Sequence, residues 1–415
     1  MNVRPADPMA ATQGAQVRAS DPKASVFVAA NAGSGKTSTL VRRVARLLLQ
    51  GARPEAVLCV TYTKAAAAEM QRRLFQELGA WAVMEDGPLR EKLADLDEPK
   101  QLLSNARALF ARALETPGGI KITTIHAFCE KLLKRFPLEA GVSPGFTVLD
   151  DAASRIVSAN ARETLALAAL ERPETAVGGA YNYFSVELDY GRFQDMFGAF
   201  ESERRAIRAY ADACERAGGY VLDIWKRCGF DDETFAPTIE AEALAATRWG
   251  QWRRAAEALV AGSPGSDRPC GEAMLRAIEA PSFAAVWAIF STKEGKPRDR
   301  MATKRVDLWA QGWLQDEQAR LVAVNERCKA ARIAEASAHA ISLALAYASL
   351  YDAAKATLRA LDFGDLIERS HELLTRRADA AWVLYKLDGG LDHLLLDEAQ
   401  DTAPDQWDIL RAITA

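Results

Sequence analysis

The sequence predicts an α/β protein in which a parallel sheet is interrupted by a large all-helical insertion. Three observations lead to this prediction. Short apolar runs rich in β-forming residues alternate with helical patterns up to about residue 150, and such alternation is typical of parallel sheets covered on both faces. A long segment with few β-branched runs follows. An apolar run of the strand type then returns near residue 395.

The first half supplies three predicted strands, each followed by a helix. The runs SVFVAA, AVLCVTYT and IKITT predict strands at 25–30, 56–63 and 120–124. Helical patterns follow from the glycine-rich turn after the first strand to about residue 50, over 64–81 and over 126–136. Alanine, leucine, glutamate and arginine, which are strong helix formers, dominate the second of these helices.

The rest of the sequence divides the chain into two predicted domains. Residues 151–357 are rich in Ala, Leu, Arg and Glu, and they predict a helical insertion with tryptophans in its core, broken by an irregular stretch at 291–305. The run LDHLLLDEAQDT at 391–402 predicts a returning strand, and a last helix is expected from residue 404. Residues 1–150 and 358–415 are therefore expected to form one sheet-containing domain.

Composition excludes several classes of protein. The 415 residues carry 52 Lys and Arg against 56 Asp and Glu, a net charge of −4, which argues against bulk-charge binding of nucleic acid but not against a local basic groove. The six cysteines form no CxxC pair, so reduced thiols are expected. The N-terminus has no signal-peptide core. The longest uncharged stretch, 336–351, is shorter than the ~20 residues that a bilayer requires, so a cytoplasmic location is expected.

The segment AANAGSGKT at 29–37 fits the phosphate-binding loop, with Ala30 where the stricter pattern has glycine. Gly33 and Gly35 let backbone N–H groups turn toward a phosphate at the positive end of a helix. Lys36 offers a cation to the β- and γ-phosphates, and Thr37 offers a hydroxyl to Mg²⁺. An ordinary strand–helix turn is the alternative. The expected nucleotide-binding residues of this loop are Ala30, Asn31, Ala32, Gly33, Ser34, Gly35, Lys36, Thr37 and Ser38.

Two carboxylates follow the leucines of LLLDEAQDT, at the strand end where open α/β sheets bind ligands. Asp397 can hold Mg²⁺ together with Thr37. Glu398 can act as the general base toward an attacking water, and Gln400 can sense the γ-phosphate. Glu398, Gln400 and Lys36 are the expected catalytic set of a nucleotide hydrolase, and Asp397 and Thr37 are the expected metal residues, because phosphoryl transfer depends mainly on positioning and charge neutralisation. A solvated strand end is the alternative.

Three further segments narrow this interpretation: CVTYTKAAAAEM at 59–70, ITTIHAFC at 122–129 and LDFGDLIERS at 361–370. With GSGKT and DEAQD they form an ordered set that resembles the motifs of the UvrD/Rep family of superfamily 1 DNA helicases, and most of all its alphaproteobacterial AddA branch. The resemblance covers roughly 12–150 and 358–415. It implies a RecA-like P-loop NTPase sheet, ATP and Mg²⁺ as cofactors, and hydrolysis coupled to 3′→5′ translocation on single-stranded DNA in double-strand-break repair and recombination.

The resemblance also implies a DNA-binding edge, where an aromatic ring stacks on a base and hydroxyls bind phosphate. The chain departs from the family at Lys64, where Asn is usual, at Ala65, where Lys is usual, and at Ala127, where Ser is common. A helix start capped by Thr124, with a packed histidine, is the alternative for the second DNA motif. The expected DNA-binding residues are Thr61, Tyr62, Thr63, Lys64, Thr124 and His126.

Gln16 and the pair Asp362 and Asp365 can each be interpreted as functional or as structural. Gln16 resembles the family's adenine-reading glutamine, since an amide can pair with adenine N6 and N7; a plain surface residue is the alternative. Asp362 and Asp365 have the spacing of a helix cap and its third residue, which predicts capping rather than catalysis.

Two basic stretches are candidates for contact with DNA phosphates. Residues 291–305 carry six basic and two acidic side chains, and they could contact duplex DNA or form a solvated loop. Residues 121–135 carry four basic side chains against one acidic side chain and adjoin the DNA motifs, so they are the better candidate.

The family's motor needs a second RecA-like domain that supplies arginines to the transition state, and neither that domain nor a nuclease domain follows DEAQD. The chain is therefore expected to be the N-terminal, ATP-binding portion of a helicase whose intact form has an AddB-like partner, and to be weakly active or inactive alone. Two alternatives stay open. One is a catalytically silent fragment that binds nucleotide or DNA, and the other is an unrelated P-loop ATPase or kinase with a helical lid.

Overall fold

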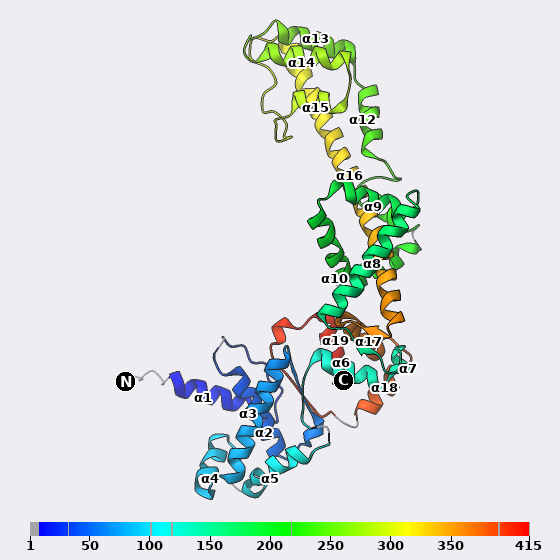
Figure 1. The fold of residues 1–415 in the computed structure, drawn as a ribbon. Helices are drawn as coiled ribbons and strands as arrows, with labels where there is room; N and C mark the ends of the chain where they lie inside the picture. Colours follow the sequence, from blue (N-terminus) through cyan, green and yellow to red (C-terminus); the bar gives the residue numbers. More distant parts are fainter. Residues whose placement is uncertain are drawn as a thin grey trace, which may run out of the picture. The chain divides into compact units, whose positions relative to one another are not determined.

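A computed structural model describes residues 8–31, 33–99, 102–117, 119–216, 218–388 and 391–414 (Figure 1). The chain divides into two compact units. Unit 1 comprises Met1–Arg155 and Lys355–Ala415, and unit 2 comprises Ile156–Ala354. The protein is mostly helical, with a small parallel sheet in unit 1.

Unit 1 is built on a parallel sheet with the strand order β2–β1–β5. Its strands are β1 (Val57–Thr61), β2 (Lys121–Thr124) and β5 (His393–Leu396), so the strands predicted at 56–63, 120–124 and within 391–402 are confirmed, as is their parallel pairing. In register, Thr61 lies beside Thr124 and Val60 beside Leu396. The carboxyl ends of all three strands therefore meet at one edge of the sheet.

The prediction of a strand at 25–30 is wrong. This segment lies outside the sheet, and Val26, Phe27 and Val28 are 43%, 83% and 41% exposed. A strand needs a neighbour that completes its ladder of backbone hydrogen bonds, and residues 25–30 pair with none of β1, β2 and β5. β-Forming residues alone do not make a strand, so the glycine-rich turn follows an irregular, exposed segment.

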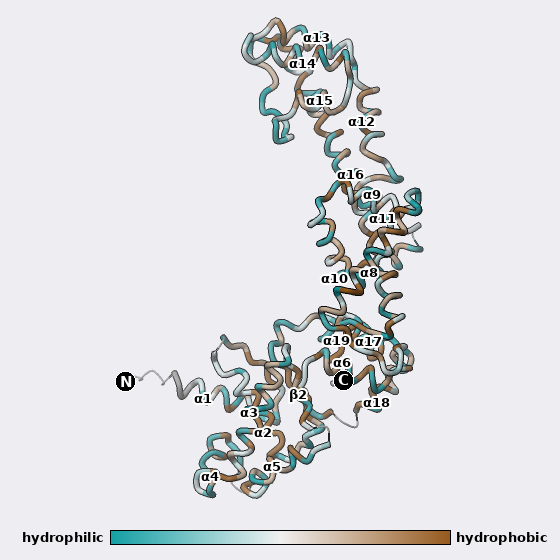
Figure 2. The backbone as a smooth tube through the Cα atoms, in the orientation of Figure 1, coloured by the Kyte–Doolittle hydropathy of each residue, from teal (hydrophilic) through white to brown (hydrophobic). Residues whose placement is uncertain are grey.

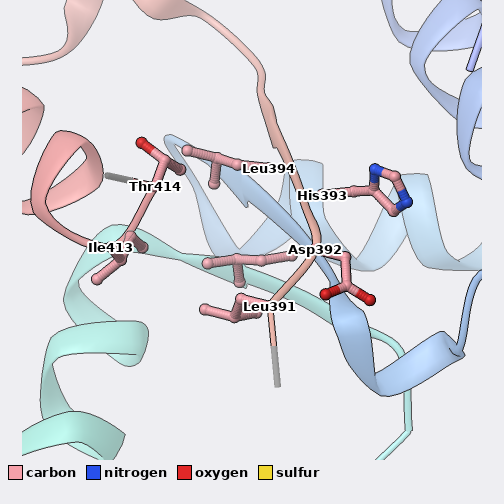
Figure 3. A pocket seen from close by; sticks show the side chains of 7 residues that line it. Leu391, Asp392, His393, Leu394, Ile413 and Thr414 are labelled. Atoms are coloured by element: carbon pink, nitrogen blue, oxygen red, sulfur yellow. The ribbon is translucent and has the colours of Figure 1, made fainter. Parts of the chain in front are cut away.

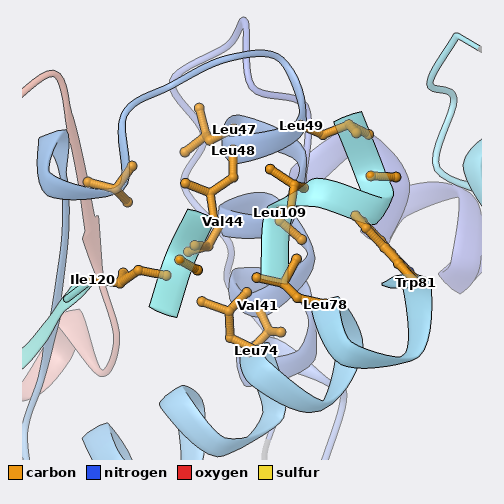
Figure 4. Packing of buried hydrophobic residues seen from close by; sticks show 14 of the residues in the cluster. Val41, Val44, Leu47, Leu48, Leu49, Leu74, Leu78, Trp81, Leu109 and Ile120 are labelled. Carbon is orange, nitrogen blue, oxygen red and sulfur yellow. The ribbon is translucent and has the colours of Figure 1, made fainter. Parts of the chain in front are cut away.

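Side chains of β1 alternate between two hydrophobic cores, one on each face of the sheet. Val57 and Cys59 enter the first core, and Leu58 and Val60 enter the second. The first core lies among α2 (Lys36–Leu49), α3 (Lys64–Val83), α4 (Asp86–Asp95) and α5 (Leu103–Glu115), and Figure 4 shows its leucines, Trp81 and Ile120 turned toward one another. The second core lies among α6 (Ile125–Arg135), α7 (Pro137–Ala140), α17 (Phe363–Thr375), α18 (Ala380–Asp388) and α19 (Pro404–Ala412).

The helices predicted after the turn, over 64–81, over 126–136 and from residue 404 are confirmed as α2, α3, α6 and α19. Other elements were not predicted. They include α1 (Pro8–Ala19), α4, α5, α7, α18, the 3₁₀ helices Pro54–Ala56 and Ala399–Asp401, and the parallel pair β3 (Thr147–Val148) and β4 (Ala360–Leu361). Strands of two residues are too short to leave a periodic pattern in the sequence.

Unit 2 is helical, as the sequence predicts, and Trp225 and Trp252 are fully buried in it. In its described residues the irregular stretch 291–305 contains one antiparallel bridge, between Ser291 and Pro297, and no helix. The helices, in chain order, are α8 (Asp151–Glu171), α9 (Ala176–Glu187), α10 (Tyr190–Glu215), α11 (Tyr220–Arg227), α12 (Ala236–Ala245), α13 (Trp249–Val260), α14 (Asp267–Glu279), α15 (Phe283–Phe290) and α16 (Leu308–Thr357).

Two features bear on the cellular environment. Helix α16 is long and apolar enough to cross a membrane by length and composition, a criterion that a long core helix also meets. Figure 2 shows hydrophilic and hydrophobic residues alternating along it. All six cysteines are free, and burial raises the pKa of the Cys59 and Cys129 thiols to about 12.

Candidate functional site

The glycine-rich turn leads directly into α2. Gly33 and Gly35 have φ values of 79° and 86°, a left-handed conformation that glycine adopts without a steric penalty. Gly35 is the N-cap of α2, and Lys36 is its first residue. The Ser34 backbone N–H donates to the Asn31 carbonyl at 3.3 Å, which closes the turn. Thus the end of α2 with free N–H groups faces the turn. Ala32, one of the predicted nucleotide-binding residues, lies outside the described residues.

The turn and the acidic end of β5 lie together in space. Lys36 Nζ is 3.8 Å from Glu398 Oε2, although the two residues are far apart in the sequence. Gln400 donates its side-chain amide to the same Glu398 carboxylate. Asp397 continues the ladder beyond β5, because its N–H donates to the Val60 carbonyl at 2.9 Å. The structure therefore brings Lys36, Asp397, Glu398 and Gln400 to the carboxyl edge of the sheet.

Glu398 has an unusual backbone conformation, with φ 53° and ψ 48°. For a residue other than glycine this left-handed conformation costs on the order of 1–3 kcal/mol, and such strain is concentrated at functional sites. It turns the chain sharply after Asp397, into the 3₁₀ helix Ala399–Asp401. The turn directs the Glu398 carboxylate back toward Lys36, whereas Asp397 stays buried, with 8% of its surface exposed.

The surroundings of Asp397 suit a cation. Burial, followed by the charge of Glu398, raises the pKa of Asp397, while the Glu398 N–H and Lys36 partly oppose that rise. A buried carboxylate beside a second negative charge is stabilised strongly by a positive ion close to it. Carboxylate and hydroxyl oxygens are the hard ligands that Mg²⁺ takes. Asp397 therefore fits the predicted metal role, and Thr37 lies in the first turn of α2 with its hydroxyl oxygen as a second donor.

The carboxyl end of β1 presents a short exposed row of side chains. Thr61 is buried, and its hydroxyl donates to the Thr63 carbonyl at 3.1 Å. Tyr62 is 61% exposed, and Thr63 and Lys64 are exposed beside it. Thr63 caps α3, accepting the Ala66 N–H at 3.0 Å. The tyrosine ring is therefore held at a fixed helix start with its surface open to a ligand.

The end of β2 has the capped geometry that the sequence left open. Thr124 is the N-cap of α6 and accepts the Ala127 N–H at 3.2 Å. His126 is half-buried and packs edge-on against the Phe363 ring, with the ring centroids 5.4 Å apart. Burial lowers the pKa of His126, which favours the neutral ring. The hydroxyl and imidazole are thus placed by local packing, and a DNA-binding role for them stays a prediction.

Gln16 packs against the glycine-rich turn, and its role in reading adenine stays a prediction. It lies on α1 with its side chain half-buried against the turn. Its Nε2 donates to the Ser34 carbonyl at 3.0 Å, and its Oε1 accepts Arg42 Nη1 at 3.1 Å. The predicted adenine-reading residue therefore contacts the phosphate-loop segment directly. No feature of the sequence singles out Arg42, because a helical pattern does not signal a contact to a residue 26 positions upstream.

The capping prediction for Asp362 and Asp365 is confirmed. Asp362 is the N-cap of α17, and the two side chains and backbone N–H groups form a reciprocal capping box. Lys355 Nζ lies 3.0 Å from Asp362 and 2.6 Å from Asp365, and all three side chains are buried. This cluster is structural, and it fixes the start of α17, where Phe363 packs on His126.

Two pockets adjoin β5, one at each of its ends. The pocket in Figure 3 lies at the amino end and is lined by Leu391, Asp392, His393, Leu394, Ile413 and Thr414 as well as Leu58. A second, smaller pocket lies at the carboxyl end and includes Tyr62, Asp397, Glu398 and Gln406. Because parallel sheets bind ligands outside their carboxyl ends, the second pocket adjoins the functional edge and the first does not.

A phosphate-loop geometry beside an acidic strand end defines a nucleotide-binding protein of the P-loop type. The sequence profile of the UvrD/REP helicase N-terminal domain matches residues 9–415, and the chain belongs to this family. The chain is 31% identical over 202 residues to an ATP-dependent helicase/nuclease subunit (AddA) from Desulforamulus reducens, covering 48% of this chain and 14% of that protein. It is 36% identical over 137 residues to the protein of the same name from Latilactobacillus sakei subsp. sakei, covering 32% of this chain and 13% of that protein. The matched region is thus a small part of the length of these relatives.

Proposed function

We propose that the chain is the ATP-binding portion of an ATP-dependent DNA helicase of the AddA type. The observation that carries the proposal is the meeting of Lys36 with Glu398 and Gln400 at the carboxyl edge of the sheet. The helicase would move 3′→5′ on single-stranded DNA and process broken ends in double-strand-break repair and recombination. It would act in the cytoplasm together with an AddB-like protein.

In this proposal residues 1–150 and 358–415, which lie within unit 1, form the RecA-like ATP-binding domain, and residues 151–357 are its helical insertion. Backbone N–H groups at Gly33 and Gly35 cradle the β-phosphate, and Lys36 binds the β- and γ-phosphates. Asp397 and Thr37 would hold Mg²⁺, which supplies charge neutralisation to the phosphates. Gln16 reads the adenine.

The contacts of Glu398 suggest how hydrolysis is coupled to nucleotide binding. Lys36 Nζ and the Gln400 amide both face the Glu398 carboxylate. A bound γ-phosphate is the stronger partner for the lysine, since it carries more negative charge. Lys36 would then leave Glu398, which becomes free to accept a proton from the attacking water. Gln400 is placed to hydrogen-bond either the glutamate or the γ-phosphate.

The DNA would lie along the exposed row at the carboxyl end of β1. A base would stack on Tyr62, with Lys64 and the hydroxyls of Thr61 and Thr63 near the phosphates. Thr124 and His126 would extend this edge at the end of β2, beside Phe363. The basic residues of 121–135 lie on β2 and α6 next to it, and they would contribute favourable charge.

The same Glu398 contacts favour one alternative, a nucleotide- or DNA-binding fragment that does not catalyse. Lys36 and Gln400 both face Glu398 Oε2, so an attacking water would have to displace one of them from that oxygen before it could transfer a proton there. If nucleotide binding does not separate the Glu398 carboxylate from these partners, the site binds ATP without turnover. Hydrolysis measurements therefore separate the two functions.

The direct test of nucleotide binding is Lys36→Ala. Purified chain should bind Mg²⁺–ATP, and the variant should lose at least about tenfold in affinity, because one charge-assisted contact to phosphate is removed. Lys386→Ala is a matched control, since this lysine lies on α18 and packs over the Trp382 ring. Binding and hydrolysis would be followed with and without single-stranded DNA. Equal affinity of wild type and Lys36→Ala would refute the proposed site, whereas binding without any DNA-stimulated hydrolysis would favour the silent alternative.

The DNA edge is tested separately with Tyr62→Ala. Stacking of one base on an aromatic side chain is worth ~1–3 kcal/mol, so the dissociation constant for an oligothymidine should rise about 5- to 150-fold. Tyr385→Ala is the matched control, because Tyr385 is also exposed, at 70%, but stacks on Trp382 in α18. Fluorescence anisotropy at low salt gives both constants. A loss of equal size in the two variants would argue against the DNA edge at β1.

A further inference from the structure

The side-chain amide of Gln16 is held at both of its ends. Gln16 Nε2 donates to the Ser34 carbonyl at 3.0 Å, and Arg42 Nη1 donates to Gln16 Oε1 at 3.1 Å. The two partners define the orientation chemically. If the amide were rotated by half a turn, its NH₂ would face the guanidinium, which can only donate, and its oxygen would face a carbonyl, which can only accept. Arg42 and Ser34 together therefore permit one orientation.

A held amide still has one N–H and one lone pair to offer a ligand. Adenine presents an acceptor at N7 beside a donor at N6, which matches this pair, whereas guanine presents acceptors at both N7 and O6. With the orientation held, guanine O6 would face the Gln16 oxygen without a proton between them. Rotation of the amide would not help guanine, because the amide oxygen would then face N7, but it would mismatch adenine at both N6 and N7. Adenine is therefore matched at both atoms only in the orientation that is held.

We propose that Arg42 is a specificity-determining residue, which makes the nucleotide site select adenine over guanine by fixing the orientation of the Gln16 amide. This inference rests on the proposed function, in which Gln16 reads the base. Arg42 acts through Gln16 and is therefore a positioning residue rather than a catalytic one.

Arg42 is free for this task, because other arginines of α2 attach α1. Arg43 Nη1 donates to the Asp21 carbonyl at 2.7 Å, and Arg46 Nη1 donates to the Val17 carbonyl at 2.9 Å. In the described part of the chain no carboxylate forms an ion pair with Arg42. Removal of Arg42 should thus leave α1 docked and change only the amide of Gln16.

Gly35 shows how closely Gln16 lies over the turn. A Cβ added at Gly35 would come within 2.9 Å of Gln16 Nε2. The amide consequently sits against the backbone that leads into α2, next to the predicted phosphate site. This placement puts the Gln16 amide within the nucleotide site rather than on a remote surface.

The test compares ATP with GTP. Dissociation constants of the Mg²⁺ complexes are measured for wild type, Arg42→Met and Gln16→Ala by calorimetry. We expect wild type to bind ATP more tightly than GTP. In Arg42→Met the ratio of the GTP to the ATP dissociation constant should fall about tenfold, which is the equivalent of one hydrogen bond. The double variant, Arg42→Met with Gln16→Ala, should show the same preference for ATP over GTP as Gln16→Ala alone, because Arg42 acts only through the Gln16 side chain. Arg42→Lys, which keeps a donor, should retain part of the preference.

Arg73→Met is the matched control. Arg73 lies on α3 and lines the same groove as Arg42, but its Nε donates to Glu69 at 2.6 Å and not to Gln16. The Arg73→Met variant should therefore prefer ATP as strongly as wild type. The inference is overturned if Arg42→Met keeps the wild-type preference, if it weakens ATP and GTP equally, or if wild type shows no preference. Failure of wild type to bind either nucleotide would overturn the proposed function itself.

Discussion

Glu398→Gln is expected to remove ATP turnover while leaving ATP bound. A positioned general base contributes about 10²–10⁴-fold to rate, so hydrolysis should fall by that factor in any form of the protein that hydrolyses ATP. Affinity for Mg²⁺–ATP should stay the same or increase. The reason is that the substitution removes a negative charge beside the phosphate site and releases Lys36, which lies 3.8 Å from Glu398.

The measurement pairs steady-state phosphate release with nucleotide binding. Asp401→Asn is a suitable control, because it removes a carboxylate from the same acidic segment and leaves Lys36 with its partner. Asp401 is exposed, and its backbone N–H donates to the Glu398 carbonyl at 3.0 Å. Normal turnover in Glu398→Gln would refute the assignment of the base, and equal losses in both variants would point to disruption of the turn rather than to chemistry.

The strained backbone of Glu398 fits the positioning role proposed for its carboxylate. The left-handed backbone at φ 53° is stabilised only by its surroundings, among them the bond from the Glu398 N–H to the Asp397 carboxylate at 3.2 Å. Asparagine or glycine would accept the conformation more readily. A glutamate held there places its carboxylate at the phosphate turn, and so the strain serves positioning.

Much of the fold was predictable because its signals are local. The strands β1 and β2 and the helices α2, α3 and α6 have clear apolar patterns, and Thr124 lies where a helix cap is expected. The error at 25–30 has a non-local cause: a strand depends on an available neighbour, and sequence pattern alone does not report one. Helix α1 carries little amphipathic pattern, and it is placed by arginines of α2.

The individual residues of the site were predictable from the sequence, but the contacts between them were not. Motif and context identified Lys36 and the acidic strand end, yet the contact between Lys36 and Glu398 requires the strand order that the structure supplies. Likewise Gln16 was singled out, whereas its partner Arg42 was not. Such contacts join segments that are distant in the chain, and they depend on side-chain geometry that composition and periodicity do not encode.

Arg46→Ala should destabilise unit 1 more than any surface substitution. Arg46 and Glu98 are 3% and 5% exposed, and Arg46 Nε lies 2.7 Å from Glu98 Oε1. Arg46 Nη1 also donates to the Val17 carbonyl and to Ser20 Oγ, at 2.9 and 3.0 Å. Removing one partner of a buried ion pair leaves an uncompensated charge and costs about 3–5 kcal/mol. Gln50 donates to Glu98, but it supplies no positive charge.

Urea unfolding measures the loss of stability in Arg46→Ala, and two comparison variants show which contacts of Arg46 cause it. Arg72→Ala removes an exposed arginine that pairs with Glu69 at 2.7 Å, and it should destabilise the protein far less than Arg46→Ala, because exposed ion pairs contribute little. Arg46→Met combined with Glu98→Leu should recover most of the stability, since apolar pairs often replace buried ion pairs without loss. If the double variant were as unstable as Arg46→Ala, the bonds from Arg46 to α1 would be the main contribution. In that case the ion pair with Glu98 would be secondary, and the docking of the helix that carries Gln16 would depend chiefly on Arg46.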